Sequence, residues 1–186
     1  FCLDGDQITT QPMKGTAPRA VNAEEDLANK HALESSEKDR SENIMIVDMI
    51  RNDLGRICQP GTITADNLFA IESLPTVWQQ TSSVSGTTEA RFSDILSTLF
   101  PCASITGAPK KRTMEIINAL EDDARGVYTG CIGVLKPDRS MRFSVAIRTL
   151  VLDTDTRSAS YGIGGGIVWD SAPLSEWQES LDKSKL

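Results

Sequence analysis

The last third of the chain constrains the fold most, because strand-like runs of β-branched and aromatic residues alternate there with short turns. The runs cover residues 127–135, 141–152 and 158–161, and the turns cover residues 136–139 and 153–155. Strands that follow one another through such turns run antiparallel. This part of the chain is therefore predicted to form an antiparallel meander.

The first two thirds mix helix and strand patterns. Asp4–Gly5 lies between two short apolar or β-branched runs, which predicts a hairpin. Good helix formers from Ala23 to Leu54, followed by Gly55, predict one long or broken helix. Further strands are expected at 68–72 and 77–84, and further helices at 91–100, from Pro109 and from Ser171. We expect an α/β (α+β) fold, with antiparallel sheets flanked by four helices, and the 186 residues suit a single domain.

Composition and charge exclude several classes of partner. The net charge is −7, whereas binding to a nucleic-acid backbone calls for a clustered basic face. No apolar run approaches the length of a membrane span.

The four cysteines are scattered without zinc or disulfide spacing, so a reducing cytoplasm is expected. The chain begins at Phe1 without a signal peptide, and we expect an internal fragment of a longer polypeptide.

A glycine-rich segment follows the last predicted strand, with glycine at positions 162, 164, 165 and 166. Glycine is entropically costly there, which predicts that backbone N–H groups approach an anionic ligand closely. The next predicted helix carries Glu176, Glu179 and Lys183 on one stripe. These charges indicate a site for a metal-bridged carboxylate. The alternative is a solvated amphipathic helix after a loose turn.

Two charged residues of the first half are also candidate site residues. Lys14 lies between Pro12 and Gly15, which place its amine at the defined end of a strand. The alternative is an ordinary exposed lysine. Glu42 precedes Ile44–Val47, a stretch that is apolar all round and so predicts burial on several sides. Glu42 is either a helix-start charge or an ion ligand on a rigid element.

Polar residues elsewhere suggest further interactions. An internal polar network is expected to contain Asp48, Arg51 and Asn52. Arg148 is the strong cation on a small-residue face of the predicted strand 141–152, which suits bidentate carboxylate recognition. Pro109 is expected at the first position of a helix whose free N–H groups form a site for an anion.

Five motifs in a fixed order resemble the chorismate-utilising enzymes, which include anthranilate, isochorismate, salicylate and aminodeoxychorismate synthases. They are Pro12–Thr16, Ser41–Asp48 with Arg51–Arg56, Ser104–Lys110, Ile147–Thr149, and Gly164–Ser171 with Glu176 and Glu179. The resemblance covers essentially the whole chain. It implies the chorismate-utilising fold, incomplete at the amino terminus, with residues 1–186 as the carboxy-terminal portion of a single chorismate-binding catalytic domain.

The resemblance also implies how chorismate is held. A Mg²⁺ site made by Glu42 and Glu179, with Glu176 beside them, would bridge to the ring carboxylate. Arg148, with Tyr128 near it, would receive the enolpyruvyl carboxylate. The other implied contacts are Ser104 close to the ring and, at the ring carboxylate, Lys183 and the backbone of Gly165 and Gly166.

Lysine in Pro-Met-Lys-Gly-Thr resembles component I of aminodeoxychorismate synthase, because the anthranilate branch usually carries alanine there. The resemblance implies that Lys14 attacks ring C2 while the C4 hydroxyl leaves, and that ammonia then attacks C4 to give 4-amino-4-deoxychorismate for para-aminobenzoate and folate. A separate glutamine amidotransferase subunit would supply the ammonia, since nothing here resembles a glutaminase Cys-His pair.

The chain departs from the family pattern at Gln79, where many members carry histidine. Glutamine can hydrogen-bond a leaving hydroxyl but cannot protonate it. The family's acidic residue in Ser-Pro-Glu-x-Phe would lie upstream of Phe1. Two alternatives stay open: an anthranilate- or isochorismate-type enzyme on the same fold, and an inactive chorismate-binding fragment.

Overall fold

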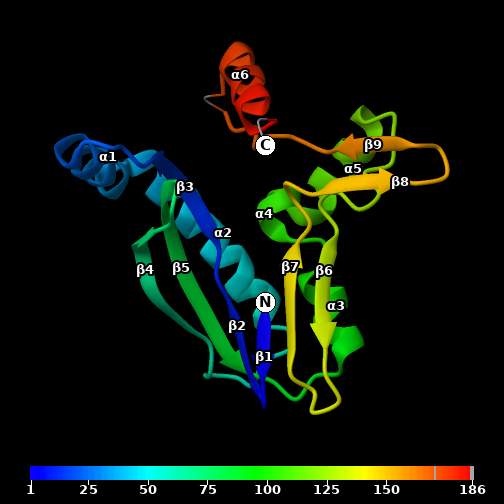
Figure 1. Ribbon diagram of the computed structural model, residues 1–186. Coiled ribbons are helices and arrows are strands. Elements are labelled where there is room, and N and C mark those ends of the chain that lie inside the picture. Colours follow the sequence, from blue (N-terminus) through cyan, green and yellow to red (C-terminus); the bar gives the residue numbers. More distant parts are fainter. Residues whose placement is uncertain (170, 185–186) are drawn as a thin grey trace. The chain divides into compact units, whose positions relative to one another are not determined.

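The computed structural model describes residues 1–169 and 171–184, which group into two compact units. Unit 1 contains Phe1–Leu99 with Val134–Arg142, and unit 2 contains Phe100–Gly133 with Phe143–Leu186. Strands β6 (Cys131–Leu135) and β7 (Met141–Val145) each have residues in both units (Figure 1). The architecture is mixed α/β with antiparallel sheets and helices, which confirms the fold class expected from the sequence.

Unit 1 is organised around the long strand β5 (Val77–Thr87), which pairs antiparallel with three other strands. These partners are β2 (Gln7–Thr10), β3 (Met13–Pro18) and β4 (Thr64–Ser73). The predicted hairpin at Asp4–Gly5 is confirmed, because β1 (Cys2–Asp4) pairs with β2 and Gly5 has φ 60°. Strand β1 also pairs with β7, so one seven-stranded sheet results.

The predicted long helix is broken into α1 (Ala23–Ser35) and α2 (Glu37–Leu54). Ser36 ends α1 and caps α2, where its hydroxyl accepts a hydrogen bond from the Asp39 backbone N–H at 3.2 Å. Helix α2 packs against β3 and β5 (Figure 1). The buried apolar side chains of these elements include Ile46, Val47, Ile50 and Leu54 of α2 and Val84 of β5. The third helix of unit 1 is α3 (Phe92–Leu99), as expected.

Helix α2 buries only one of its faces. The expectation that Ile44–Val47 is buried on several sides was therefore wrong, and so was the expected internal network of Asp48, Arg51 and Asn52. Ile46 and Val47 are 3% and 1% exposed, but Ile44 and Met45 are 37% and 43% exposed. A helix with 3.6 residues per turn cannot direct four consecutive side chains toward one sheet. The polar residues on the outer face are also exposed, and Arg51 pairs with Asp48 at the surface, at 3.0 Å.

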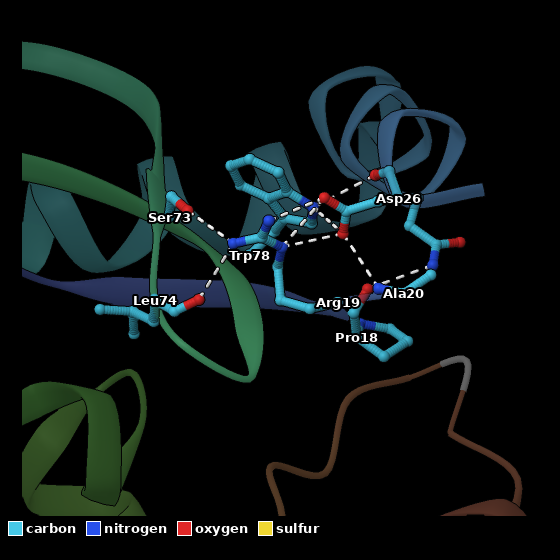
Figure 2. A network of polar contacts seen from close by, with 8 residues as sticks. Pro18, Arg19, Ala20, Asp26, Ser73, Leu74 and Trp78 are labelled. Atoms are coloured by element: carbon cyan, nitrogen blue, oxygen red, sulfur yellow. Dashed lines mark hydrogen bonds and ion pairs between the residues drawn. The ribbon is translucent and has the colours of Figure 1, made fainter. Parts of the chain in front are cut away.

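A polar network joins three segments of unit 1 at the start of α1 (Figure 2). The Arg19 guanidinium donates to Asp26 at 2.8 Å, and it also donates to Ser73 Oγ at 2.7 Å in strand β4. Trp78 Nε1 of β5 donates to Asp26 at 3.0 Å, and its ring lies 4.2 Å below the guanidinium. The Arg19 hydrogen bond, followed by that from the Ala20 backbone, lowers the Asp26 pKa to about 2. This network ties the end of β3 to the β4–β5 turn.

Unit 2 holds three helices and a separate hairpin, so the described residues contain six helices where four were expected. The helices are α4 (Ala103–Thr106), α5 (Lys110–Leu120) and α6 (Pro173–Lys183), and the hairpin strands are β8 (Leu150–Asp153) and β9 (Ser158–Tyr161). Pro109 precedes α5 as its N-cap, one residue before the expected position. No helix among the described residues is long and apolar enough to cross a bilayer.

The expected strand 141–152 is interrupted, which corrects part of the predicted meander. Strand β7 ends at Val145 and β8 begins at Leu150. Between them the Ala146 backbone N–H donates to Gly130 O at 2.9 Å, and Ala146 O accepts from the Thr129 N–H at 2.8 Å. The strand ends directly after this pairing, because the Ile147 N–H turns back to Val145 O at 3.0 Å and Arg148 has φ 49°, which is outside the range of a strand. Residues 127–130 are accordingly a turn, and the strand expected from Val127 begins only at Cys131.

Candidate functional site

Two of the predicted site residues, Lys14 and Glu42, lie together in unit 1. Lys14 is on β3 and Glu42 is near the start of α2. Lys14 Nζ lies 3.7 Å from Glu42 Oε2, and each side chain is 26% exposed. The amine is therefore held beside a carboxylate on a partly covered surface, and the alternative of an ordinary exposed lysine does not describe it.

Strand β3 is irregular where it carries Lys14. Met13 pairs with Thr81 and Thr16 pairs with Gln79, so Lys14 and Gly15 together oppose the single residue Gln80. This is a β-bulge, which bends a strand and redirects a side chain. Gly15 has φ 86°, a conformation that glycine adopts without strain. The bulge thus sets the direction in which the chain leaves Lys14.

The bulge is packed closely against the junction of α1 and α2. A Cβ added to Gly15 would lie 2.9 Å from both Asp39 Cβ and Leu33 Cδ1. Such a distance is shorter than van der Waals contact, so only glycine fits. Glycine is favoured at position 15 for two physical reasons: the positive φ, and the close approach of side chains from the neighbouring helices.

The Gln79 side chain is bound to the same bulge. Its amide Nε2 donates to Gly15 O at 2.7 Å, and its Oε1 accepts from the Thr16 hydroxyl at 3.0 Å. Sequence reasoning placed Gln79 at the site as a hydrogen-bonding partner of the substrate and missed this link. No signal in the sequence would have shown it, because it depends on the register of β3 against β5.

In unit 2 the Tyr128 ring packs against the glycine-rich segment. A Cβ on Gly162 would lie 2.6 Å from Tyr128 Cδ2, and a Cβ on Gly164 would lie 2.8 Å from the Tyr128 hydroxyl oxygen. Burial raises the pKa of Tyr128. Two of the four glycines therefore make room for a ring, which is a reason for glycine that the sequence did not show, and the approach of backbone N–H groups to an anion stays a prediction.

Gly165 makes room for two carboxylates of α6. A Cβ on Gly165 would lie 3.2 Å from Glu176 Oε2 and 3.9 Å from Glu179 Oε1. Lys183 donates to Glu179 Oε1 and also to Gly164 O, the latter at 3.3 Å. The predicted stripe of Glu176, Glu179 and Lys183 therefore faces the glycine-rich segment, so these charges are not simply a solvated face.

One carboxylate oxygen in this cluster lacks a partner. Glu176 Oε1 accepts a hydrogen bond from Ser171 Oγ at 2.6 Å, but the buried Oε2 has no hydrogen-bond partner among the described residues. A buried, unpaired carboxylate oxygen is strongly unfavourable. An open cavity of about 350 Å³ lies beside it, lined in part by Gly165, Ser171 and Trp177.

These features fit a divalent cation. Hard cations such as Mg²⁺ bind carboxylate oxygens, and a cation at Glu176 and Glu179 would give the orphaned Oε2 a partner. Within residues 1–169 and 171–184, no three His, Cys, Asp or Glu side chains gather as a metal site. Glu176 and Glu179 supply two carboxylates in unit 2, and Glu42 belongs to unit 1.

The remaining predicted residues lie in unit 2. Arg148 is exposed in the break between β7 and β8 and has φ 49°, so the strand-face argument made for it was wrong. Ser104 is half-buried in α4, with Oγ 3.1 Å from Cys102 Sγ. Gly166 lies in the exposed glycine-rich segment. Asp170, quoted with that motif, lies outside the described residues.

A comparison with solved structures defines the class of protein. Anthranilate synthase component I from Streptococcus pneumoniae superimposes with a TM-score of 0.87 at 36% identity, covering 99% of this chain and 40% of that one. The chorismate binding enzyme family matches residues 1–186, and the chain belongs to this family. The resemblance drawn from the five motifs is thereby confirmed.

Curated relatives point to two members of the family. Aminodeoxychorismate synthase component 1 of Klebsiella aerogenes is 44% identical over 95% of this chain and 39% of its own length. Anthranilate synthase component 1 of Saccharolobus solfataricus is 39% identical over 100% of this chain and 44% of its own length. The chain therefore spans about two fifths of the length of these relatives.

Proposed function

We propose that the chain is the chorismate-binding part of an enzyme that converts chorismate and ammonia to 4-amino-4-deoxychorismate. The observation that carries the proposal is the placement of Lys14, whose amine lies 3.7 Å from Glu42 on a bulge that is packed against two helices. An amine at a defined position can act as a nucleophile toward the substrate ring. The relatives named aminodeoxychorismate synthase component 1 support the same choice.

The proposed reaction proceeds in two displacements. The Lys14 amine forms a bond to ring C2 as the C4 hydroxyl leaves, and ammonia then forms a bond to C4 as the lysine leaves C2. The net change is the exchange of the C4 hydroxyl for an amino group with release of water. Lys14 is the proposed nucleophile of this step.

Substrate binding in the proposal uses a cation at each carboxylate. Arg148, with Tyr128 near it, receives the enolpyruvyl carboxylate, because a guanidinium binds carboxylates in bidentate fashion. Ser104 lies close to the ring. Lys183 and the backbone of Gly165 and Gly166 assist at the ring carboxylate.

Mg²⁺ is the proposed cofactor. Glu176 and Glu179 would hold it, supported by the unpartnered Glu176 oxygen, and Glu42 stays a candidate ligand on the family resemblance alone. When bound, the ion would supply a positive charge to the ring carboxylate of chorismate.

The partner proposed for the enzyme is a glutamine amidotransferase subunit that supplies ammonia. The name component 1, which several relatives carry, is consistent with a second component. We propose that the product serves the para-aminobenzoate and folate pathway. A cytoplasmic location is proposed from the four cysteines, all free thiols in the structure.

Anthranilate synthase activity is the second candidate, because the Saccharolobus enzyme matches the whole chain at 39% identity. In that reaction ammonia attacks the ring directly, without a lysine adduct. The two candidates therefore differ in the product and in the intermediate. Lys14 favours amination through an adduct.

The test supplies the whole protein with chorismate, Mg²⁺ and ammonia and identifies the product by mass spectrometry. Aminodeoxychorismate is expected, and anthranilate as the product would replace the proposal by the second candidate. Without ammonia, an adduct is expected that peptide mapping places on Lys14. Conversion of chorismate with no adduct on Lys14 would contradict the covalent step.

A further inference from the structure

We propose that Gln79 is a positioning residue that holds the bulge carrying Lys14, and that it acts on the reaction through Lys14. The proposal rests on the function proposed above only where turnover is concerned, since its structural part concerns Lys14 alone. It replaces the sequence-based assignment of Gln79 as a partner of the leaving hydroxyl.

The Gln79 side-chain amide lies against the bulge. Its nitrogen donates to Gly15 O at 2.7 Å and its oxygen accepts from Thr16 Oγ1 at 3.0 Å. Both ends of the amide therefore bind the two residues that directly follow Lys14. Extra residues in a bulge lose ladder hydrogen bonds, so a side chain that binds them replaces part of the lost pairing.

The bulge is held from another direction as well. Gly15 packs against Leu33 and Asp39, leaving no space for a Cβ. Asp39 and Glu42 are one turn apart on α2, so the same helix packs on Gly15 and faces the Lys14 amine. Gln79 on one strand and α2 together determine where Lys14 points.

The chemistry of an amide limits what Gln79 can do in the reaction. An amide neither gains nor loses a proton near neutral pH, so Gln79 cannot transfer a proton to a leaving hydroxyl. Its hydrogen bonds to the bulge instead match what a positioning group does. Displacing a reacting group by as little as ~1 Å can lower the rate of a reaction by about 100-fold.

The first experiment needs no substrate. The whole protein is treated with an amine-acetylating reagent, and the rate at Lys14 is measured by peptide mapping relative to Lys30, which is similarly exposed at 32% and paired with Glu34. Gln79→Met keeps the side-chain length and removes both hydrogen bonds. Acetylation of Lys14 should become roughly fivefold faster or more, because the bulge opens more often.

Two further variants sharpen this measurement. Thr16→Val removes one of the two bonds and should give a smaller increase, and the double variant should not exceed Gln79→Met, because the Thr16 bond runs through Gln79. Gln7→Met, an exposed glutamine of β2 in the same sheet, is the matched control and should leave Lys14 acetylation unchanged. An unchanged Lys14 rate in folded Gln79→Met would overturn the proposal.

The second experiment measures turnover. Gln79→Met should lower kcat by about 10- to 100-fold with little change in KM for chorismate. In the Lys14→Ala background, the same substitution should leave the residual turnover unchanged, because its effect passes through Lys14. A further loss in that background would show that Gln79 acts on the substrate directly and would overturn the proposal. If no aminated product forms in any variant, the proposed function fails, while the acetylation result still decides the positioning role.

Discussion

The Lys14 cluster of unit 1 and the Glu176 cluster of unit 2 hold their charged groups in different ways. The Lys14 cluster consists of Lys14, Glu42 and Gln79. Gln79 is hydrogen-bonded to the two residues that follow Lys14 on the bulge, and the Lys14 amine lies near Glu42. The Glu176 cluster consists of Glu176, Glu179 and Lys183. Its buried Glu176 oxygen has no hydrogen-bond partner among the described residues, and the carboxylates of Glu176 and Glu179 both lie beside the backbone of Gly165. The Lys14 cluster therefore has its interactions within the chain, whereas the Glu176 cluster has a buried oxygen that lacks a hydrogen-bond partner among the described residues.

This difference agrees with the two roles proposed above. A group that must react in a defined direction benefits from being held before the substrate arrives. A group that must bind an ion benefits from an oxygen that is buried and unpaired, since the ion then gains an interaction that water does not already supply. The four predictions below test this contrast, beginning with the largest expected effect.

Lys14→Ala should lose at least about 100-fold in turnover while chorismate binding stays largely intact, because the nucleophile is removed and the carboxylate contacts remain. Lys14→Arg should be little better, since a guanidinium stays protonated. Steady-state kinetics and a binding titration with chorismate measure the two quantities. Wild-type turnover with ammonia in Lys14→Ala would remove Lys14 from the reaction and end the contrast.

Glu179→Gln should raise the Mg²⁺ concentration needed for half-maximal activity by about tenfold or more, because one ligand charge is lost. The measurement is a Mg²⁺ titration of activity, together with calorimetric titration of Mg²⁺ into the protein. Glu115→Gln, an exposed carboxylate of α5 that pairs with Arg112, is the matched control and should change neither. Full activity of the wild type in excess EDTA would contradict the role assigned to the Glu176 cluster.

Replacing glycine by alanine should distinguish the packing of the two clusters. Gly162→Ala inserts a methyl group against Tyr128 and should destabilise the protein by about 1–3 kcal/mol. Gly15→Ala adds a strained φ to a similar clash, and should cost about 1–2 kcal/mol more. Urea unfolding measures both. The cost of Gly162→Ala should fall in a Tyr128→Ala background, and equal costs in both backgrounds would contradict the packing seen here.

The smallest effect concerns the pH dependence of the unit 1 network. The pKa of Asp26 is about 2 in the folded protein, below its ordinary value of 3.8, because Arg19 donates to it. A carboxyl group whose pKa is lowered on folding stabilises the fold at pH values above its ordinary pKa. This contribution disappears as the pH falls through about 2. The difference in urea midpoint between wild type and Asp26→Asn should be constant above pH ~4 and shrink between pH ~4 and pH ~2. A difference that does not change with pH would contradict the lowered pKa.

Much of the fold could be predicted because it depends on local patterns. Glycine at a turn marked the β1–β2 hairpin, and alternating residues marked β4 and β5 to within a few residues of their ends. The break between β7 and β8 was missed, since the apolar pattern continues through it. The chain leaves the strand there because the Ile147 N–H turns back to Val145 O and Arg148 has a positive φ.

The candidate site divides in the same way. The sequence by itself determined the family, because five motifs of fixed order carry side chains whose chemistry can be recognised before any folding is known. It also determined that Glu176, Glu179 and Lys183 share a stripe, since helical spacing requires this. Only the tertiary structure decided that Gln79 binds the Lys14 bulge, that Tyr128 occupies the space left by Gly162, and that one Glu176 oxygen is left unpaired. These three features depend on side chains from segments distant in sequence that approach within a few ångströms, and no local pattern encodes such a distance.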